Sequence, residues 1–427
     1  MMRHILLTIT ALMGTFASAD DHLDTFINTD VFELEVAADP QISPDGTQIA
    51  YVRTANDIMT DRARSNIWIV SSDGVDHRPL LSGTASYSSP RWSHDGNRLA
   101  YVSSAEGRGP QLYVRWMDTG QTALLSNLQN APVGISWSPD DSQIAFSALV
   151  ATEQDQLATA PARPEGADWA PGVRVISDLN YRADGRGYLE SGYSHIFLLP
   201  ADGGTPRQIT QGEFNHGGKL DWTTDGNEII FSANRNDDWR ERARNSDLWL
   251  LNTHTGEMRQ LTDRQGPDYA PSLSPDGSRL AYLGYEDRLM GYHNAQVSIL
   301  DLNSGQITQL TEGLDRSIDS VDWAGSSSQL LISFDDFGQR KIASVDMEGN
   351  LRPLVSDAGS AGISRPYTSG SVSVAGNGAY AYTAGGPQRP ADVALGHDDT
   401  AIRLTDLNAD LLDHKQLGEV REISWRS

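Results

Sequence analysis

Short apolar runs recur along this chain, and each follows a polar turn. The turns are SPDG at 43–46, SHDG at 93–96, SPDD at 138–141, TTDG at 223–226, SPDG at 274–277, AGSS at 324–327 and AGNG at 375–378. The runs that follow them read IAYV, LAYV, IAFS, IIFS, LAYL, LLIS and AYAY. Successive copies lie about fifty residues apart, with one wider interval after the third, and such a period is typical of repeated β-units. The pattern therefore predicts seven copies of one β-structured unit.

Each copy predicts four strands. An apolar residue stands at one equivalent position before every turn, as if packed between neighbouring units: Ile42, Trp92, Trp137, Trp222, Leu273, Trp323 and Val374. A third apolar run and a short fourth one follow, such as IWIV from Ile67 and RPLLS from Arg78. Asp-Gly suits the tight turns because glycine adopts positive φ at little cost. We predict an all-β chain that forms a seven-bladed β-propeller of four-stranded antiparallel blades. A β-sandwich or two smaller sheets are the alternatives, and neither explains seven copies in register.

The order of the repeats predicts how the ring closes and where ligands bind. The first and last repeats each supply all four of their own strands, so we expect closure by packing, without strand exchange. The connections between second and third strands are long at 53–65, 151–194, 233–245 and 284–294. Because adjacent strands run in opposite directions, these loops should leave from one face, which in repeat scaffolds is often the binding face. Neutral loop growth is the alternative interpretation.

The insertion at 151–194 is the largest departure from the repeat. Its first part is polar and rich in proline, and its second part regains strand character. The candidate substrate-binding residues in the second part are Arg174, Tyr181, Arg182, Asp184 and Glu190. A solvated loop is the alternative interpretation of these charges.

Composition excludes several kinds of site. The chain has no cysteine, which excludes disulfides, thiolate metal sites and a cysteine nucleophile. Its net charge of −24 argues against binding to nucleic acid or to an anionic membrane surface, because both require a basic face. We therefore predict no nucleic-acid partner.

The N-terminus has the layout of a secretory signal peptide. Arg3 and His4 precede a mostly apolar run at 5–16, and an Ala-Ser-Ala sequence then predicts cleavage between Ala19 and Asp20. The run is too short to span a bilayer, although a membrane anchor or a buried helix is the alternative. We therefore expect an exported protein, in a bacterial periplasm or the medium, with no membrane span.

The expected division of the chain follows from the leader and the repeats. It comprises a signal peptide (1–19), an N-terminal segment leading into the propeller (20–38), the propeller (39–408) and a linker (409–427).

Catalytic motifs are missing from the sequence. It has no G-x-S-x-G, H-E-x-x-H, phosphate-binding loop, EF-hand loop or dinucleotide fingerprint, and its histidines lack metal-ligand spacing. The string at 216–218 (HGG) looks like a lipase oxyanion loop, but its place before a predicted strand favours a connecting turn. We therefore predict no catalytic residue, no metal site and no cofactor in this chain.

Several segments carry a resemblance to a known family. They are 30–34 (DVFEL), 39–46 (DPQISPDG), 181–188 (YRADGRGY), 390–393 (PADV) and 403–408 (RLTDLN). From about Thr25 to Ser427 the chain resembles the N-terminal propeller of the prolyl oligopeptidase (S9) family of serine peptidases, in its acylaminoacyl-peptidase and dipeptidyl-aminopeptidase branch. The S-P-D-G turns are also shared by TolB-like and WD40-like propellers.

The resemblance implies a function for the propeller. In that family an α/β-hydrolase domain with a Ser-Asp-His triad follows the propeller, which restricts access to short peptides. This sequence ends about where that domain would begin, so we expect the non-catalytic, substrate-gating half of an exported peptidase, truncated or split and inactive alone. Its implied partners are a peptide substrate and a serine hydrolase domain, in the same chain or from an adjacent reading frame. A free-standing TolB-like periplasmic propeller that binds a protein partner is the alternative, and a lactonase-like propeller with a central metal is a third hypothesis.

Overall fold

The computed structural model describes residues 24–107, 109–152, 161–170, 174–359 and 369–426, so the predicted signal peptide and its cleavage site at Ala19 and Asp20 lie outside the described residues. The described chain is mostly β-strand, and its helices are short: η1 (Asn28–Phe32), η2 (Ala105–Gly107) and α1 (Ala409–Leu412). None of the described helices has the length and apolar character needed to cross a membrane. The all-β class predicted from the repeats is confirmed.

The first five repeats each form one four-stranded antiparallel sheet with its strands in chain order. The first two sheets contain β2 (Glu35–Ile42), β3 (Gln48–Asp57), β4 (Arg62–Ser71) and β5 (His77–Leu81), then β6 (Tyr87–Trp92), β7 (Arg98–Ser103), β8 (Gln111–Trp116) and β9 (Thr122–Leu124). The third contains β10 (Val133–Trp137), β11 (Gln143–Ala151), β14 (Gly192–Pro200) and β15 (Arg207–Gln208). The fourth and fifth contain β16 (Gly217–Trp222), β17 (Glu228–Ala233), β18 (Asp247–Asn252) and β19 (Met258–Gln260), then β20 (Asp268–Leu273), β21 (Arg279–Gly284), β22 (Gln296–Asp301) and β23 (Ile307–Gln309).

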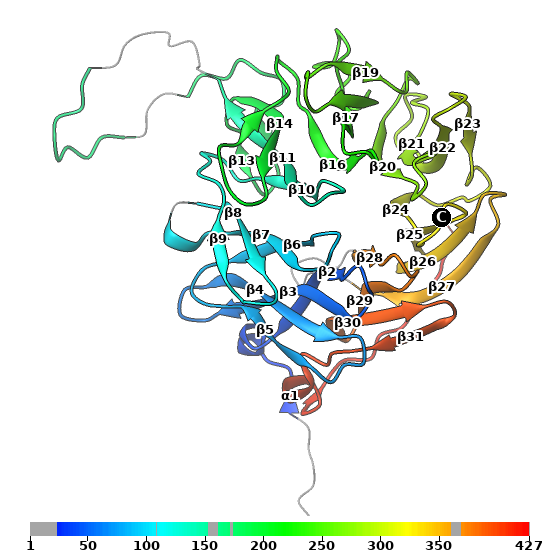
Figure 1. The fold of residues 1–427 in the computed structure, drawn as a ribbon. Helices are drawn as coiled ribbons and strands as arrows, with labels where there is room; N and C mark the ends of the chain where they lie inside the picture. Colours follow the sequence, from blue (N-terminus) through cyan, green and yellow to red (C-terminus); the bar gives the residue numbers. More distant parts are fainter. Residues whose placement is uncertain (1–23, 108, 153–160, 171–173, 360–368, 427) are drawn as a thin grey trace, which may run out of the picture.

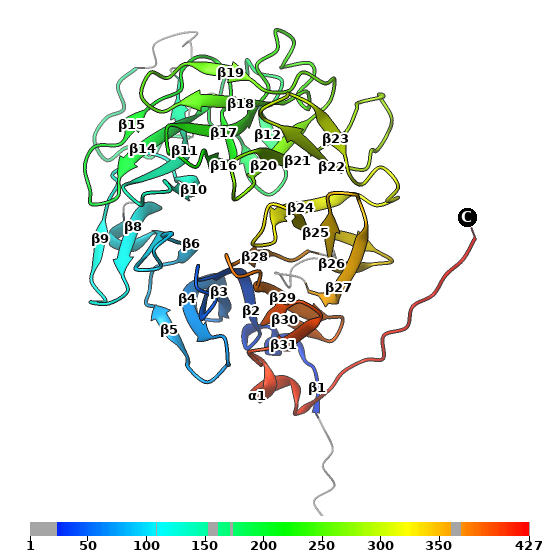
Figure 2. The same cartoon turned by 45° about the vertical axis from the view of Figure 1, so that its right-hand side comes forward.

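The last two repeats share one eight-stranded sheet. Its strands are β24 (Ile318–Trp323), β25 (Gln329–Asp336), β26 (Gln339–Asp346), β27 (Leu351–Ala358), β28 (Val372–Val374), β29 (Tyr380–Gly386), β30 (Arg389–His397) and β31 (Thr400–Arg403). The two halves join through a single register pair, Ala358 with Ala384, because the end of β27 reaches β29. The described repeats therefore form five sheets of four strands and one of eight, and two further sheets have two strands each. Figures 1 and 2 show them following one another around a ring in chain order, with the first sheet beside the last.

The apolar residue before each turn packs between neighbouring sheets, as the sequence predicts. Trp137 shares a buried cluster with Val114 of the preceding sheet, and Trp323 shares one with Val297. The other five positions do the same in their own clusters: Ile42, Trp92, Trp222, Leu273 and Val374. Each contact between sheets is thus built around the same repeat position.

Side-chain hydrogen bonds explain the Ser-x-Asp-Gly turns. The hydroxyl of Ser43 donates to Asp45 at 2.6 Å and accepts the main-chain N–H of Gln48 at 3.0 Å, which closes the turn from within. Gly46 has φ 78°, a conformation that favours glycine. Ser93, Ser138, Thr223 and Ser274 make the same 2.6 Å bond to the aspartate two residues later.

A bulge interrupts the innermost strand of each of the first five sheets. The register shifts within β2, β6, β10, β16 and β20. The residues with positive φ at these places are Asp39 (46°), Ser89 (54°), Gly134 (65°), Gly218 (81°) and Ala270 (52°). A Cβ atom on Gly134 would lie 2.6 Å from the main-chain oxygen of Gly218, so neighbouring innermost strands approach each other closely here.

A segment near the C-terminus pairs with the start of the described chain. β1 (Asp24–Thr25) pairs in parallel with β32 (Lys415–Gln416), and the Lys415 ammonium lies 2.9 Å from a carboxylate oxygen of Asp30. The Asn408 amide also exchanges two hydrogen bonds of 2.8 Å with the main chain of Glu35. Part of the predicted linker at 409–427 is therefore attached to the N-terminal segment.

One predicted loop is instead a hairpin. The sequence predicts a long connection at 53–65, but β3 and β4 continue in register as far as Asp57 opposite Arg62. The added residues are mostly polar or only partly buried, so no alternation of apolar and polar positions marks them as strand.

Candidate functional site

The insertion of the third repeat brings some of the predicted site residues together. The Arg174 guanidinium carbon lies 4.1 Å from the ring centroid of Tyr188, and the ring of Tyr181 lies 6.2 Å from the same ring. Arg182 lies on β12 (Arg182–Ala183), which pairs with β13 (Gly187–Tyr188). An arginine against two exposed tyrosines is a surface on which an extended peptide could lie.

The two predicted carboxylates lie apart from this arginine–tyrosine contact. Asp184 is in the exposed turn between β12 and β13, and Glu190 is exposed just after β13. No contact described in the structure joins either of them to Arg174 or Tyr181. All five residues remain a predicted substrate-binding set.

Exposed apolar side chains lie in the connections between the second and third strands of several repeats. We call the end of the sheets that carries these connections the loop face, and the opposite end, with the turns at 43–46 and its equivalents, the turn face. The exposed side chains on the loop face include Ile58, Met59, Ile176, Leu179, Tyr181, Tyr188, Leu289, Met290, Tyr292 and Phe337. Both ends of a four-stranded antiparallel repeat reach the loop face, because its strands alternate in direction. This face therefore combines apolar surface with the chain crossings between sheets.

Charged side chains of the innermost strands form ion pairs between different sheets. Arg91 Nη1 lies 2.9 Å from a carboxylate oxygen of Asp39 on the neighbouring sheet. Lys219 on β16 pairs with Asp322 on β24, and so reaches past the fifth sheet. Ser272 of that fifth sheet also donates to Asp322, at 3.5 Å. These pairs join innermost strands on both sides of the central space.

A cavity of about 460 Å³ lies among the innermost strands at the turn face. It is bounded by residues of the second to fifth sheets, among them Arg91, Trp92, His94, Pro139, Asp221 and Leu273. The Asp221 carboxylate accepts the main-chain N–H groups of Leu273 at 2.7 Å and Trp222 at 3.0 Å. Burial raises the pKa of Asp221, and the charge of Lys219 beside it opposes that rise.

His94, which lines this cavity, contacts Asp141, and both residues depart from the repeat. His94 stands where three other turns have proline, and Asp141 stands where five have glycine. The Asp141 carboxylate accepts the main-chain N–H of His94 at 2.8 Å and lies 2.9 Å from its Nδ1. Neither residue is among the predicted site residues, although the departure of both positions from the repeat is visible in the sequence.

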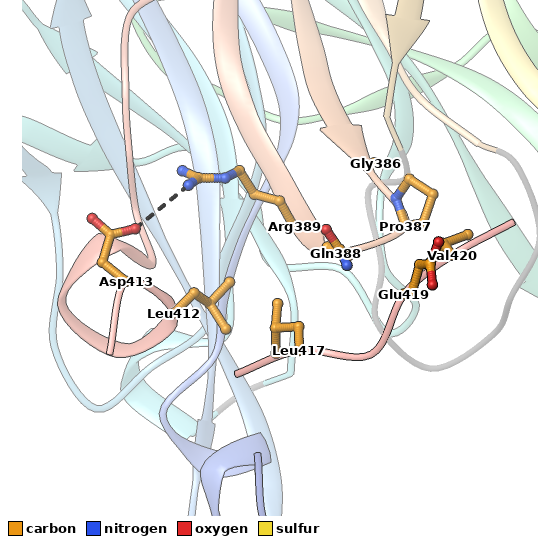
Figure 3. A pocket seen from close by; sticks show the side chains of 9 residues that line it. All are labelled: Gly386, Pro387, Gln388, Arg389, Leu412, Asp413, Leu417, Glu419 and Val420. Atoms are coloured by element: carbon orange, nitrogen blue, oxygen red, sulfur yellow. Dashed lines mark ion pairs between the residues drawn. The ribbon is translucent and has the colours of Figure 1, made fainter. Parts of the chain in front are cut away.

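A second cavity, of about 520 Å³, lies at the C-terminal segment. Figure 3 shows it between the β29–β30 turn and the segment from Leu412 to Val420, with Arg389 directed toward Asp413. Arg389 pairs with Asp406 and lies 3.7 Å from Asp413, while the Gln388 amide donates to Gly418 O. These contacts hold the segment against the last sheet.

Titratable groups are also buried beside the third and fourth sheets. His216 is fully buried, its ring stacks on that of His195 at 5.3 Å, and Arg235 contacts its Nε2 at 2.5 Å. Burial, then the charge of Arg235, lowers the pKa of His216 to about 4. Burial and the neighbouring Asp268 raise the pKa of Asp247 to about 6. In the part of the chain that the structure describes, no three His, Asp or Glu side chains converge as a metal site would require.

Two family models match parts of the chain. A model described as the TolB beta propeller domain matches residues 43–160, and one described as the dipeptidyl peptidase IV (DPP IV) N-terminal region matches residues 186–287. Together they cover repeats in both halves of the ring.

Relatives and solved structures are similar over most of the chain. An uncharacterized peptidase, YuxL, from Bacillus subtilis is 29% identical over 76% of this chain and 51% of its own length. The acylaminoacyl peptidase of Pyrococcus horikoshii has a TM-score of 0.71 at 18% identity, over 93% of this chain and 56% of its own. The propeller domain of the trilobed protease of Pyrococcus furiosus, whose topology is described as open velcro, has a TM-score of 0.62 at 14% identity, over 89% of this chain and 98% of its own.

The matched fraction of each relative's length shows which part of the relative this chain corresponds to. This chain spans about half the length of the curated relative that it matches, and nearly all of an isolated propeller domain. The resemblance predicted from the sequence is confirmed: over most of its length this chain is similar to the N-terminal propeller of the prolyl oligopeptidase (S9) family of serine peptidases.

Proposed function

We propose that this chain is the non-catalytic propeller of an exported S9-type peptidase, and that it admits short peptides to a serine hydrolase domain. The hydrolase domain would belong to the same polypeptide or to a separate chain. The observation that carries the proposal is the loop face, where exposed apolar side chains such as Met59, Leu289 and Phe337 surround the chain crossings. Exposed apolar surface of this kind marks an interface with another protein surface.

We further propose that the seven repeats form a ring that closes by packing alone. Ile42 of the first sheet shares a buried cluster with Ala381 and Val393 of the last sheet. The Ser373 hydroxyl accepts the main-chain N–H of Ile42 at 2.9 Å. These contacts support closure without exchange of a strand, so the first and last repeats can separate without breaking a sheet.

The proposed function assigns the chain no hydrolase activity by itself. A covalent serine mechanism needs a nucleophile held against a general base, and the sequence contains no G-x-S-x-G motif. Purified chain should therefore fail to react with a fluorophosphonate probe, and stoichiometric labelling would contradict the proposal. Export is tested by sequencing the N-terminus of mature protein from the expressing cells, which should begin at Asp20.

Capture of a partner separates the main proposal from its alternative. The tagged chain is incubated with the α/β-hydrolase part of its own gene or of a neighbouring gene, and binding is measured by calorimetry. A hydrolase domain that binds, and that loses binding when Met59, Leu289 and Phe337 are replaced by serine, supports the peptidase role. The same substitutions at Ile307 and Ile402, on outer strands, serve as the control. Stable capture of an envelope protein without hydrolase character would instead favour the TolB-like scaffold. The match of residues 43–160 to the TolB beta propeller model supports that alternative.

A further inference from the structure

We propose that the cavity at the turn face binds a short peptide through the peptide's free C-terminal carboxylate. This site lies at the opposite end of the sheets from the loop face. The choice of a peptide as ligand rests on the proposed function, whereas the recognition of a carboxylate rests on the residues of the cavity.

The size and lining of the cavity suit a small ligand. Its volume of about 460 Å³ falls within the range of small-molecule sites. Trp92, Leu273, Pro139 and Pro275 line it, and all four side chains are partly or fully exposed. They form an apolar wall against which the C-terminal side chain of a peptide can pack.

Arg91 supplies a positive charge to this wall. Its Nη1 lies 2.9 Å from Asp39 and donates to Pro90 O at 2.6 Å, and the side chain is 34% exposed. The described contacts of the guanidinium all use Nη1. A planar guanidinium binds carboxylates with two parallel N–H donors, so Nε and Nη2 can take a carboxylate from the cavity.

His94 is a second group fixed toward a ligand. Asp141 has 8% of its side chain exposed and holds His94 through the main-chain N–H and through Nδ1. It also accepts the N–H of Asp95 at 2.9 Å. With Nδ1 engaged, Nε2 is the ring atom left for an external partner, and the side chain is 57% exposed. Nε2 can therefore form a hydrogen bond with a polar group of the bound peptide.

Backbone strain accompanies this arrangement. Asp141 has φ 57°, in the left-handed region that favours glycine and that aspartate adopts more readily than most residues with a side chain. Five equivalent turns have glycine at this position, whereas this turn has the aspartate whose carboxylate contacts His94. Strain of this kind gathers at ligand sites.

The Asp221 carboxylate is already engaged by groups of the protein, which reduces its repulsion of an anion in the cavity. It already accepts two main-chain N–H groups and lies beside Lys219, which also pairs with Asp322. Asp39 is likewise engaged by Arg91 and by the Gln41 amide at 2.8 Å. The negative charges near the cavity therefore have partners within the protein.

The test compares two ligands that differ only in the carboxylate. Binding of N-acetyl-Ala-Phe and of N-acetyl-Ala-Phe-amide to the purified chain is measured by calorimetry. We expect the acid to bind at least tenfold more tightly than the amide, and R91Q to abolish that preference. H94Q, which loses the imidazole that Asp141 orients, should weaken binding of the acid severalfold. R352Q, at an outer arginine that is 49% exposed, is the matched control and should leave both affinities unchanged.

A second variant guards against a misfolded R91Q protein. R91K keeps the charge and the link to Asp39 but loses the two-donor geometry, so the preference for the acid should fall by an intermediate factor. Equal affinity for acid and amide, or an unchanged preference in folded R91Q or R91K, would overturn the proposal, as would the absence of saturable binding. Phosphate that competes as strongly as the acid would overturn the peptide assignment. If peptide binding fails while the hydrolase domain is still captured, only this inference is wrong.

Discussion

The indole Nε1 of Trp137 donates to the main-chain oxygen of Arg91 on the preceding sheet at 3.0 Å. Trp92 makes the equivalent bond to Gln41, Trp323 to Ser272, and Trp222 a longer one to Ser136. The acceptor is always the residue just before the equivalent repeat position of the preceding sheet. Each of these tryptophans therefore both fills an interface between sheets and fixes the register of one sheet against the next.

Replacing Trp137 by phenylalanine tests the hydrogen bond separately from the packing. Phenylalanine keeps most of the buried ring but leaves the Arg91 carbonyl without its donor, so W137F should lower the free energy of unfolding by about 1–3 kcal/mol. W137A also opens a cavity and should cost about 3–5 kcal/mol. Urea denaturation measures both values. W425F, at a ring that is 78% exposed, is the control, and a W137F protein as stable as the parent would contradict the role of the bond.

Substituting Ala270 by glycine tests the bulges of the innermost strands. Ala270 has φ 52°, where glycine avoids a steric cost of about 1–2 kcal/mol, which equals or exceeds the entropic penalty of about 0.5–1 kcal/mol that glycine brings through the unfolded chain. A270G should therefore be neutral or up to about 1 kcal/mol more stable than the parent. A281G, in the fully buried regular strand β21, should be destabilising by urea denaturation. Equal losses in both variants would show that the bulge carries no strain.

Some features could be predicted from the sequence because they recur from repeat to repeat. The apolar residue before each turn, which is Ile42 in the first repeat and Val374 in the last, recurs beside a similar turn. One interpretation of its packing therefore applies to every copy. The hairpin of β3 and β4 gave no such signal, because strand pairs that project beyond the core need no apolar alternation. The contact of Arg174 with Tyr188 depends on how the insertion folds back. His94 and Asp141 are informative only as a pair, and their contact across two sheets needed the structure.

Replacing Asp247 by asparagine should stabilise the protein at high pH. Burial and the charge of Asp268 raise the pKa of Asp247 from 3.8 to about 6 in the folded state. The stability that this group contributes is therefore complete below about pH 4 and is lost as the pH rises through 6. D247N should exceed the parent by roughly 2 kcal/mol at pH 8 and by little at pH 4. D315N, at a side chain that is 95% exposed, is the control. A constant difference across this range would contradict the assignment.

His216 should dominate a loss of stability in weak acid, with the opposite sign. Burial first, and then the charge of Arg235, lower its pKa from 6.5 to about 4. The unfolded chain therefore takes up a proton that the folded protein refuses, so the contribution is complete above pH 6.5 and declines by about 3 kcal/mol as the pH falls to 4. H216Q can still accept a hydrogen bond from Arg235 but cannot titrate.

The slope of unfolding free energy against pH distinguishes His216 from the many carboxylates that titrate lower. Urea denaturation between pH 4 and 8 should show a smaller slope in H216Q than in the parent. R235M removes the neighbouring charge and should reduce the slope in part, because the burial of His216 remains. H254Q, at an exposed histidine, should keep the slope of the parent. A parent-like slope in H216Q would mean that the buried imidazole does not govern the acid limit of the fold, and the stacked neighbour His195 would be the next group to replace.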